Sequence, residues 1–289
     1  PDSSRFDEFY LNRTGLTVGV EEVLFSRQTP FQKVEVLRTD SWGNLMTIDG
    51  LVMLSEQDEF VYHEMLVHVP MLTHPRPRRV LIIGGGDGGS AREVLKHPGV
   101  VHVDMVEIDQ AVVEASKLHF PGVGRFDDPR LHVRYEDGIE FVRRAGENGE
   151  TYDVVIIDGS DPVGPAEGLF EASFVHNCRW VLSDQGVFCS QSESPWVKAF
   201  HPGMKRLHSG LKREFPRVDT YLSWIPLYPA GMWSMMMATL GEAPTAAATL
   251  ERVQSAAGTF LAGCRYYNAD IHSGAFALPT FVRGILGRE

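Results

Sequence analysis

The pattern of apolar and polar positions divides the chain into two parts with different periods. Between about residues 17 and 54 the two kinds of residue alternate, as in KVEVLRT and NLMTIDGLVML, and the DSWGN and DG sequences are typical of turns. A period of two indicates half-buried strands, so we expect a small antiparallel β region here. The following apolar residues, from Phe60 to Val69, have helical spacing, and the proline-rich stretch THPRPRR ends this predicted helix. A domain boundary is therefore expected near Thr73.

Beyond this boundary, strand-like and helix-like segments alternate. The segments RVLIIGGG, VHVDMVEID, LHVRYED and YDVVIID have strand patterns, and helices are expected to begin near Ser90, Gln110 and Gly138. Strands that alternate with helix-length segments predict βαβ units and a parallel sheet. We therefore expect an α/β protein in which residues 1–73 form an N-terminal β domain with a connecting helix. Residues 74–289 should form a Rossmann-like domain.

The 289 residues have the composition of an ordinary soluble protein and a formal net charge of −11. A negative field argues against a nucleic-acid partner and favours small cationic ligands. Cys178, Cys189 and Cys264 are far apart and form no CxxC pair, so neither a disulfide framework nor a zinc site is predicted. No apolar run approaches the roughly 18 residues of a membrane span, and the first residues lack the regions of a signal peptide. A cytoplasmic protein without a membrane partner is expected.

The segment VLIIGGGDGGSAREVL contains a glycine-rich turn between a predicted strand and a predicted helix. Gly84, Gly86 and Gly89 match the GxGxxG pattern of nucleotide-binding turns, and Glu107 ends the next strand, where an acid binds ribose hydroxyls. The alternative is a turn whose glycines only let strand and helix pack closely. NAD(P) is the usual ligand, but Asp87 lies where the pyrophosphate should bind and would repel it. A ligand with adenosine but no phosphate fits better.

S-adenosylmethionine is such a ligand, and a further aspartate supports it. Asp137 follows the third predicted strand, where it could accept the adenine amino hydrogens; the alternative is a solvated turn before a helix. Intact S-adenosylmethionine carries a carboxylate near the first glycine turn, and Asp87 would repel this carboxylate. Decarboxylated S-adenosylmethionine carries only a cationic amine there. The sequence therefore favours the decarboxylated ligand.

Two more aspartates follow the strand YDVVIID, in the stretch IIDGSDPVGP. Asp158 and Asp161 come at the carboxyl end of a predicted parallel strand, where open α/β sheets bind their ligands. Two carboxylates this close repel each other unless a cation lies between them, so a cationic substrate is indicated. The alternative for Asp161, which precedes Pro162, is a turn-forming residue.

Together with DEFVYHEM, EDG, DGSDPVGPAEGLF, IPLYPAG and CRYYNADIHSGAFALP, these motifs resemble those of the spermidine synthases, the polyamine aminopropyltransferases. The resemblance runs from about residue 18 to residue 281. It implies a methyltransferase-type Rossmann-like domain after a small β domain, and a homodimer or homotetramer. It also implies aminopropyl transfer from decarboxylated S-adenosylmethionine to putrescine, which gives spermidine and 5'-methylthioadenosine.

The resemblance also assigns roles to residues at matching positions. Donor binding is implied for Gln32, His63, Asp87, Glu107, Asp137, Gly138 and Pro165. Acceptor binding is implied for Tyr62, Asp158, Gly159, Ser160, Asp161 and Tyr228. Asp158 is expected to be the catalytic proton acceptor, with Tyr62 as its hydrogen-bond partner. For Tyr62, Tyr228 and His63 the alternative is a structural role as core side chains.

The expected chemistry needs neither a metal nor a cofactor, because the carbon beside a sulfonium is already activated toward an amine. An alkyl ammonium has a pKa close to that of lysine, about 10.4, so a carboxylate should fix the amine and accept its proton. Two departures from the family pattern bear on the choice of acceptor: Gly159 stands where larger residues are common, and Leu11 stands about where many members carry an aromatic residue. Cadaverine, agmatine and spermidine are alternative acceptors. An NAD-dependent oxidoreductase and a binding protein that has lost catalysis are alternative functions.

Overall fold

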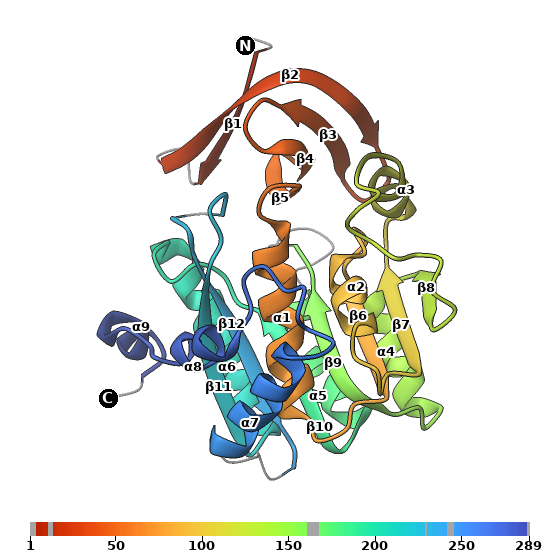
Figure 1. The fold of residues 1–289 in the computed structure, drawn as a ribbon, viewed down its shortest axis with the longest axis vertical. Helices are drawn as coiled ribbons and strands as arrows, with labels where there is room; N and C mark the ends of the chain where they lie inside the picture. Colours follow the sequence, from red (N-terminus) through yellow and green to blue (C-terminus); the bar gives the residue numbers. More distant parts are fainter. Residues whose placement is uncertain (1–3, 11–13, 161–167, 229, 242–245, 288–289) are drawn as a thin grey trace.

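Two sheets organise the chain (Figure 1), and the computed structural model describes residues 4–10, 14–160, 168–228, 230–241 and 246–287. A five-stranded antiparallel sheet lies at one end of the molecule, and a seven-stranded sheet flanked by helices forms the rest. The prediction of an α/β fold, with a small antiparallel β domain before a Rossmann-like domain, is confirmed.

The N-terminal sheet has the strand order β1-β2-β3-β4-β5, and each strand is antiparallel to its neighbours. Its strands are β1 (Arg5–Tyr10), β2 (Thr14–Gln28), β3 (Lys33–Thr39), β4 (Gly43–Ile48) and β5 (Leu51–Ser55). The DG turn between β4 and β5 is tight because Asp49 and Gly50 both have positive φ, 51° and 79°. The sequence did not predict β1, so the sheet is larger than expected.

The second sheet has the order β11-β12-β10-β9-β6-β7-β8, in which β6 to β10 are parallel and β12 is antiparallel to both its neighbours. The strands are β6 (Arg79–Gly84), β7 (His102–Glu107), β8 (Leu131–Tyr135), β9 (Tyr152–Asp158), β10 (Leu182–Gln191), β11 (Arg217–Trp224) and β12 (Met232–Thr239). Helices cover both faces of the sheet, which explains why β6, β7 and β9 are nearly continuous apolar runs.

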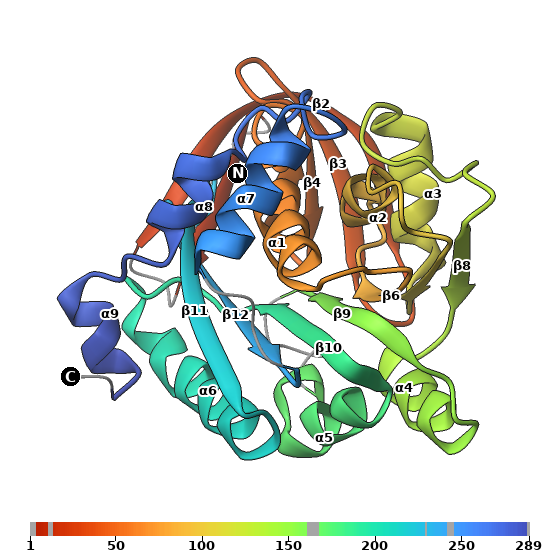
Figure 2. The ribbon, with the colours of Figure 1, turned by 60° about the horizontal axis from the view of Figure 1, so that its bottom comes forward.

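One face of this sheet carries a core that includes α1 (Glu59–Thr73), α2 (Gly89–Leu95), α7 (Ala246–Ala257) and α8 (Ala269–Ala275). The opposite face carries α4 (Gly138–Glu147), α5 (Ala172–Trp180), α6 (His201–Glu214) and α9 (Thr280–Ile285), as Figure 2 shows. A short 3-10 helix, η2 (Lys198–Phe200), precedes α6, and α3 (Gln110–His119) packs against β2 and β3. Among the helices described, none is long and apolar enough to cross a membrane.

The connecting helix α1 is buried along almost its whole length. It packs against α2, α7, β9, β10 and β11, so its neighbours belong mainly to the second sheet. A helix that is apolar nearly all round is expected in such a position. The boundary near Thr73 stays a prediction, because α1 joins the two sheets rather than belonging clearly to the first.

The strand order creates a place for a ligand between β6 and β9. The chain runs from β6 through β7 to β8 on one side, and then returns to place β9 on the other side of β6. In open α/β sheets, ligands bind outside the carboxyl ends of the strands at such a switch point. Gly84 pairs with Asp158 here, and the N-terminal sheet lies beyond these strand ends (Figure 1).

Candidate functional site

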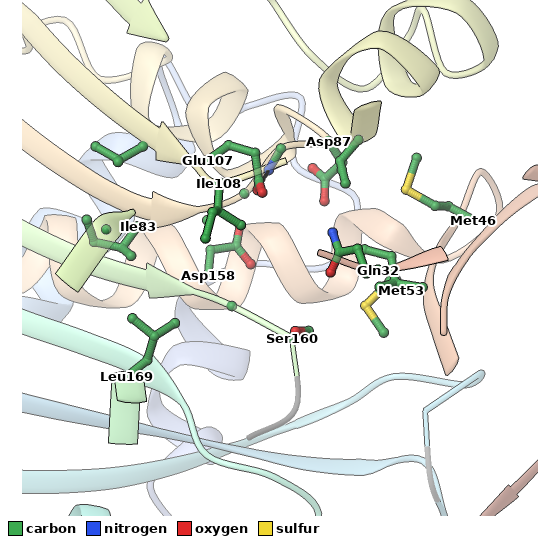
Figure 3. A pocket seen from close by; sticks show the side chains of 18 of the residues that line it. Gln32, Met46, Met53, Ile83, Asp87, Glu107, Ile108, Asp158, Ser160 and Leu169 are labelled. Carbon is green, nitrogen blue, oxygen red and sulfur yellow. Dashed lines mark hydrogen bonds between the residues drawn. The ribbon is translucent and has the colours of Figure 1, made fainter. Parts of the chain in front are cut away.

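A cleft lies between the carboxyl ends of β6, β7 and β9 and the N-terminal sheet. Figure 3 shows that the carboxylates of Asp87, Glu107 and Asp158 come from three neighbouring strand ends and point toward the same hollow. The predicted site residues that line it are Gln32, Tyr62, His63, Asp87, Glu107, Asp137, Gly138, Asp158, Gly159, Ser160 and Tyr228. Asp161 and Pro165 lie outside the described residues. The individual roles assigned to these residues stay predictions.

The glycine turn after β6 fixes the backbone of Asp158. Gly84 and Gly85 have φ values of 82° and 68°, which glycine adopts without steric cost. The Gly85 amide donates a hydrogen bond of 2.9 Å to the Asp158 carbonyl oxygen. A Cβ atom on Gly85 would lie only 2.9 Å from Asp158 Oδ2. These two glycines therefore let the turn pack directly against the predicted catalytic residue.

The Asp158 side chain is buried. Tyr62 donates a hydrogen bond of 2.8 Å to Asp158 Oδ1, while Oδ2 has no hydrogen-bond partner within the described part of the chain. Burial, and next the negative charge of Asp87, raise the pKa of Asp158. Burial and the charge of Asp158 raise the pKa of Tyr62 well above its usual value, so Tyr62 keeps its proton and remains a donor. This arrangement suits a carboxylate that accepts a proton from a bound group.

Asp87 is held as an anion at the start of α2. Its Oδ1 accepts a 2.6 Å hydrogen bond from the Gly89 amide and lies 3.2 Å from His63 Nε2. The other ring nitrogen of His63 lies 2.6 Å from Glu59 Oε2. Burial would lower the pKa of His63, but Asp87 and Glu59 raise it well above its usual value. Burial raises the pKa of Asp87, but the charge and hydrogen bond of His63, the Gly89 amide and the charge of Arg92 together lower it overall.

Glu107 ends β7 beside the glycine turn. Its two oxygens accept hydrogen bonds from the amides of Gly86, at 3.2 Å, and Asp109, at 2.9 Å. Burial raises the pKa of Glu107 to about 7, since it outweighs both hydrogen bonds. Each carboxylate oxygen has a second lone pair, so Glu107 can also accept hydrogen bonds from two ligand hydroxyls.

Asp137 is the N-cap residue of α4. Its Oδ1 accepts hydrogen bonds from the amides of Ile139, at 2.7 Å, and Glu140, at 3.3 Å. This capping role matches the alternative of a turn residue before a helix. Asp137 also lines the cleft, so contact with a bound purine stays compatible with its position.

A second, smaller hollow continues from the cleft past Tyr62 and Tyr228. The Tyr228 ring lies 5.7 Å from that of Tyr62 and 4.8 Å from that of Trp233, and its hydroxyl donates to the Met53 carbonyl oxygen at 2.7 Å. Aromatic faces at this position provide an apolar passage that attracts cations. Trp233 thus joins Tyr62 and Tyr228 in the wall of this hollow.

Sequence reasoning missed two polar residues of the second hollow and most of the apolar cleft wall. Glu8 comes from β1 and Gln191 from the end of β10, and both line the second hollow. The missed apolar residues of the cleft are Met46, Ile48, Met53, Ile83, Val106, Ile108, Val112, Ile139 and Leu169. The stretch RFDEFY lacks a strict apolar–polar alternation, so no local pattern predicts β1, and none reveals which strand ends meet across the two sheets.

Another group of ionisable residues lies behind the cleft. His68 Nε2 is 2.9 Å from Glu93 Oε2 and 3.4 Å from Cys264 Sγ, a spacing compatible with metal ligands. However, Arg92 and Lys96 also bind the Glu93 carboxylate, at 2.7 and 2.5 Å. These two cations neutralise the carboxylate and would repel a metal ion. We therefore interpret this group as a buried ion-pair network, and the prediction of no metal stays untested.

Comparison with known proteins identifies the family. The family model described as "Spermine/spermidine synthase domain" matches residues 59–245, and that described as "Spermidine synthase tetramerisation domain" matches residues 5–56. The polyamine aminopropyltransferase of Alkaliphilus metalliredigens is 45% identical over 270 residues, which cover 93% of this chain and 92% of the relative. That of Clostridium acetobutylicum is 40% identical over 280 residues, which cover 96% of each.

Solved structures agree with the sequence relatives. A spermidine synthase in complex with the transition-state analogue AdoDATO has a TM-score of 0.92 and 36% identity, with 99% of this chain and 96% of that chain covered. The spermidine synthase from Thermotoga maritima has a TM-score of 0.89 and 35% identity, with 100% and 96% covered. The resemblance seen in the sequence motifs is thereby confirmed. The chain belongs to the spermine/spermidine synthase family.

Proposed function

We propose that the protein transfers the aminopropyl group of decarboxylated S-adenosylmethionine to putrescine and releases spermidine and 5'-methylthioadenosine. The observation that carries this proposal is the pair of carboxylates, Asp87 and Asp158, that face one cleft at the switch point of the sheet. Both substrates are cations, and two anions offset the repulsion between them. The names of the relatives, polyamine aminopropyltransferase and spermidine synthase, support the same reaction.

In this proposal the donor lies along the glycine turn. Glu107 accepts hydrogen bonds from the ribose hydroxyls, and the apolar residues of the cleft, such as Ile83 and Ile108, surround the adenine. Asp87 binds the ammonium of the aminopropyl tail and repels the carboxylate that intact S-adenosylmethionine would place there. The His63 charge beside Asp87 keeps this carboxylate ionised.

The acceptor amine lies on the other side of the reacting carbon, next to Asp158. Asp158 fixes the amine and accepts one of its protons, and the nitrogen lone pair then forms a bond to the carbon beside the sulfonium. The carbon–sulfur bond breaks, and its electron pair stays on sulfur, so methylthioadenosine leaves as a neutral thioether. Holding both substrates in line removes most of the entropic barrier to their encounter.

The acceptor range is expected to follow the length of the second hollow. Putrescine should give the highest kcat/KM and cadaverine the next, because a chain of the wrong length leaves a buried acid unpaired, at a cost of about 1–3 kcal/mol. Rates should rise between about pH 7 and 9 as more of the amine becomes neutral. The measurement is kcat/KM for a panel of putrescine, cadaverine, agmatine and spermidine. An agmatine or spermidine value about tenfold above that of putrescine would contradict this acceptor assignment.

The rise in Tm caused by different ligands distinguishes an aminopropyltransferase from an NAD-dependent oxidoreductase. Methylthioadenosine at about one hundred times its Kd should stabilise the protein by about 2.7 kcal/mol and raise its Tm, whereas NADH at the same concentration should not. The reverse result would favour an oxidoreductase.

We further propose that the enzyme is a homo-oligomer, either a dimer or a tetramer. Residues 5–56 match a domain family named for tetramerisation, and the exposed side chains of Phe9 and Val23 on β1 and β2 give this sheet apolar surface. Light scattering coupled to size-exclusion chromatography distinguishes the two states.

A cytoplasmic location stays a prediction, supported by Cys178, Cys189 and Cys264, which are all free thiols.

Gly85→Ala should impair both stability and catalysis. A left-handed backbone costs a residue with Cβ roughly 1–2 kcal/mol, and the new methyl group would push against Asp158 Oδ2. We expect a lower Tm and a loss of about tenfold or more in kcat. Gly50→Ala is the matched control, because Gly50 also has positive φ, 79°, but a Cβ there meets nothing within 4 Å. Equal loss of kcat in both variants would refute the close contact with Asp158.

A further inference from the structure

One buried carboxylate outside the cleft connects the N-terminal sheet to the turn that carries Tyr228. Asp58 lies between β5 and α1 and is 5% exposed. Its Oδ1 accepts a hydrogen bond of 2.6 Å from the Ser55 hydroxyl, and its Oδ2 accepts one of 3.1 Å from the Leu227 amide. Asp58 therefore bridges two segments that are far apart in the sequence. It lines neither the cleft nor the second hollow.

The turn at residues 225–228 needs such an anchor because its own hydrogen bonds do not fix its orientation relative to the N-terminal sheet. The Tyr228 amide bonds to the Ile225 carbonyl oxygen, and the amides of Ile225 and Gly231 close the turn on itself. Hydrogen bonds connect this turn to β5 and to the β5–α1 junction: the Tyr228 hydroxyl donates to the Met53 carbonyl oxygen in β5, and the Leu227 amide donates to Asp58 at the junction. The Leu227 side chain adds contact with the core of the N-terminal sheet.

The two bonds act on adjacent residues, so they fix the direction in which the Tyr228 ring points. The ring is part of the wall of the second hollow, between Tyr62 and Trp233. Burying an ionised carboxylate costs folding free energy. Burial accordingly raises the pKa of Asp58, even though the hydrogen bonds from Ser55 and the Leu227 amide lower it. Asp58 also makes no side-chain hydrogen bond that caps α1, so the helix end does not explain it.

We propose that Asp58 is a positioning residue for the amine acceptor: it holds the 225–228 turn against the β5–α1 junction and so places Tyr228 beside the amine. This inference rests on the proposed function, because that function supplies the amine that passes Tyr228. The donor is held by other elements, namely the turn after β6 and the end of β7. Loss of Asp58 therefore weakens acceptor binding and leaves donor binding intact.

The test uses binding to the full-length enzyme without turnover. The Kd of methylthioadenosine is measured first, and the Kd of putrescine is then measured with methylthioadenosine saturating, both by titration calorimetry. Asp58→Ala should raise the Kd of putrescine about tenfold, as expected for a lost hydrogen bond to a charged group, and change that of methylthioadenosine by less than about threefold. In turnover, the KM for the amine should rise more than kcat falls.

Two further variants separate positioning from general destabilisation. Ser55→Ala removes the partner of Oδ1 but leaves the Leu227 bond, so its putrescine Kd should stay within about twofold of wild type. Asp58→Asn keeps an oxygen that can accept from Leu227, so it should recover most of the affinity lost in Asp58→Ala. If Asp58→Ala does not fold, Asp58→Ser, whose side chain is one atom shorter than the carboxylate that reaches Leu227, takes its place, and it should likewise lose more affinity for putrescine than for methylthioadenosine.

An equal loss of affinity for putrescine and methylthioadenosine, or an unchanged putrescine Kd in a folded Asp58→Ala protein, would overturn the proposal. These results differ from failure of the proposed function. If wild-type enzyme binds methylthioadenosine but not putrescine, the acceptor assignment is wrong, and a positioning role for Asp58 toward that amine falls with it. If wild type binds both ligands and only the variant data disagree, the function stands and this inference fails.

Discussion

Asp158→Asn is expected to lower kcat by about 100-fold or more, since general-base catalysis is typically worth 10²–10⁴ in rate. The amide keeps the shape of the side chain and can still accept the 2.8 Å hydrogen bond from Tyr62, but it cannot accept a proton. Because the change leaves the donor side of the cleft intact, the Kd of methylthioadenosine should change by less than about threefold. Steady-state kinetics and calorimetry give both values.

Protein stability should move in the opposite direction to activity. The pKa of Asp158 is raised in the folded protein, so the ionised carboxylate lowers the free energy of unfolding once the pH exceeds its unfolded pKa. Asp158→Asn removes this cost, and its Tm at about pH 8 should equal or exceed that of wild type. Asp184→Asn makes the same substitution at an exposed position of β10 and serves as the control, so both its Tm and its kcat should match those of wild type. A kcat loss below about threefold for Asp158→Asn would show that another group accepts the proton.

Asp87→Asn should reduce both donor affinity and donor selectivity. The carboxylate attracts the ammonium of the decarboxylated donor and repels the extra carboxylate of intact S-adenosylmethionine, and such like-charge contacts cost several kcal/mol. We expect kcat/KM for the decarboxylated donor to fall by about tenfold or more. The ratio of Kd values for intact and decarboxylated S-adenosylmethionine should also fall by about tenfold or more.

The Asp87 variant has a second readout in His63. Asp87 helps to raise the pKa of His63, so its removal should lower that pKa, while Glu59 still faces the other ring nitrogen. The Tm should fall in Asp87→Asn, because the folded state lowers the pKa of Asp87 overall and so gains stability from its ionised form. Unchanged discrimination between the two donors in a folded variant would place donor selectivity elsewhere in the cleft.

Much of the central architecture could be predicted from local patterns. The runs that became β6, β7 and β9 are apolar because helices cover both faces of the sheet, and GxGxxG marks the turn that must pack closely against Asp158. The positions of Asp87, Glu107 and Asp158 at strand ends follow from the parallel order alone. The carboxyl ends of parallel strands share one edge of the sheet, so the sequence alone is enough to place these three carboxylates together.

The parts that could not be predicted depend on contacts between distant segments. The antiparallel pairing of β11 with β12 could not be predicted, because the sequence of a strand does not reveal whether its neighbour runs parallel or antiparallel to it. The contributions of Glu8 and Met46 to the two hollows depend on how the N-terminal sheet lies over the second sheet. The bridge from Asp58 to Leu227 joins residues 169 positions apart, and no local pattern predicts such a pair. Asp161, Pro165 and Leu11 lie outside the described residues.

The most direct test of the account is a product assay with isotope-labelled decarboxylated S-adenosylmethionine and putrescine. Mass spectrometry should detect labelled spermidine and methylthioadenosine in equal amounts, with no metal or cofactor added, and Asp158→Asn should form both about 100-fold more slowly or worse. Methylthioadenosine without spermidine, or no conversion by a protein that binds both substrates, would contradict aminopropyl transfer to putrescine as the function of this protein.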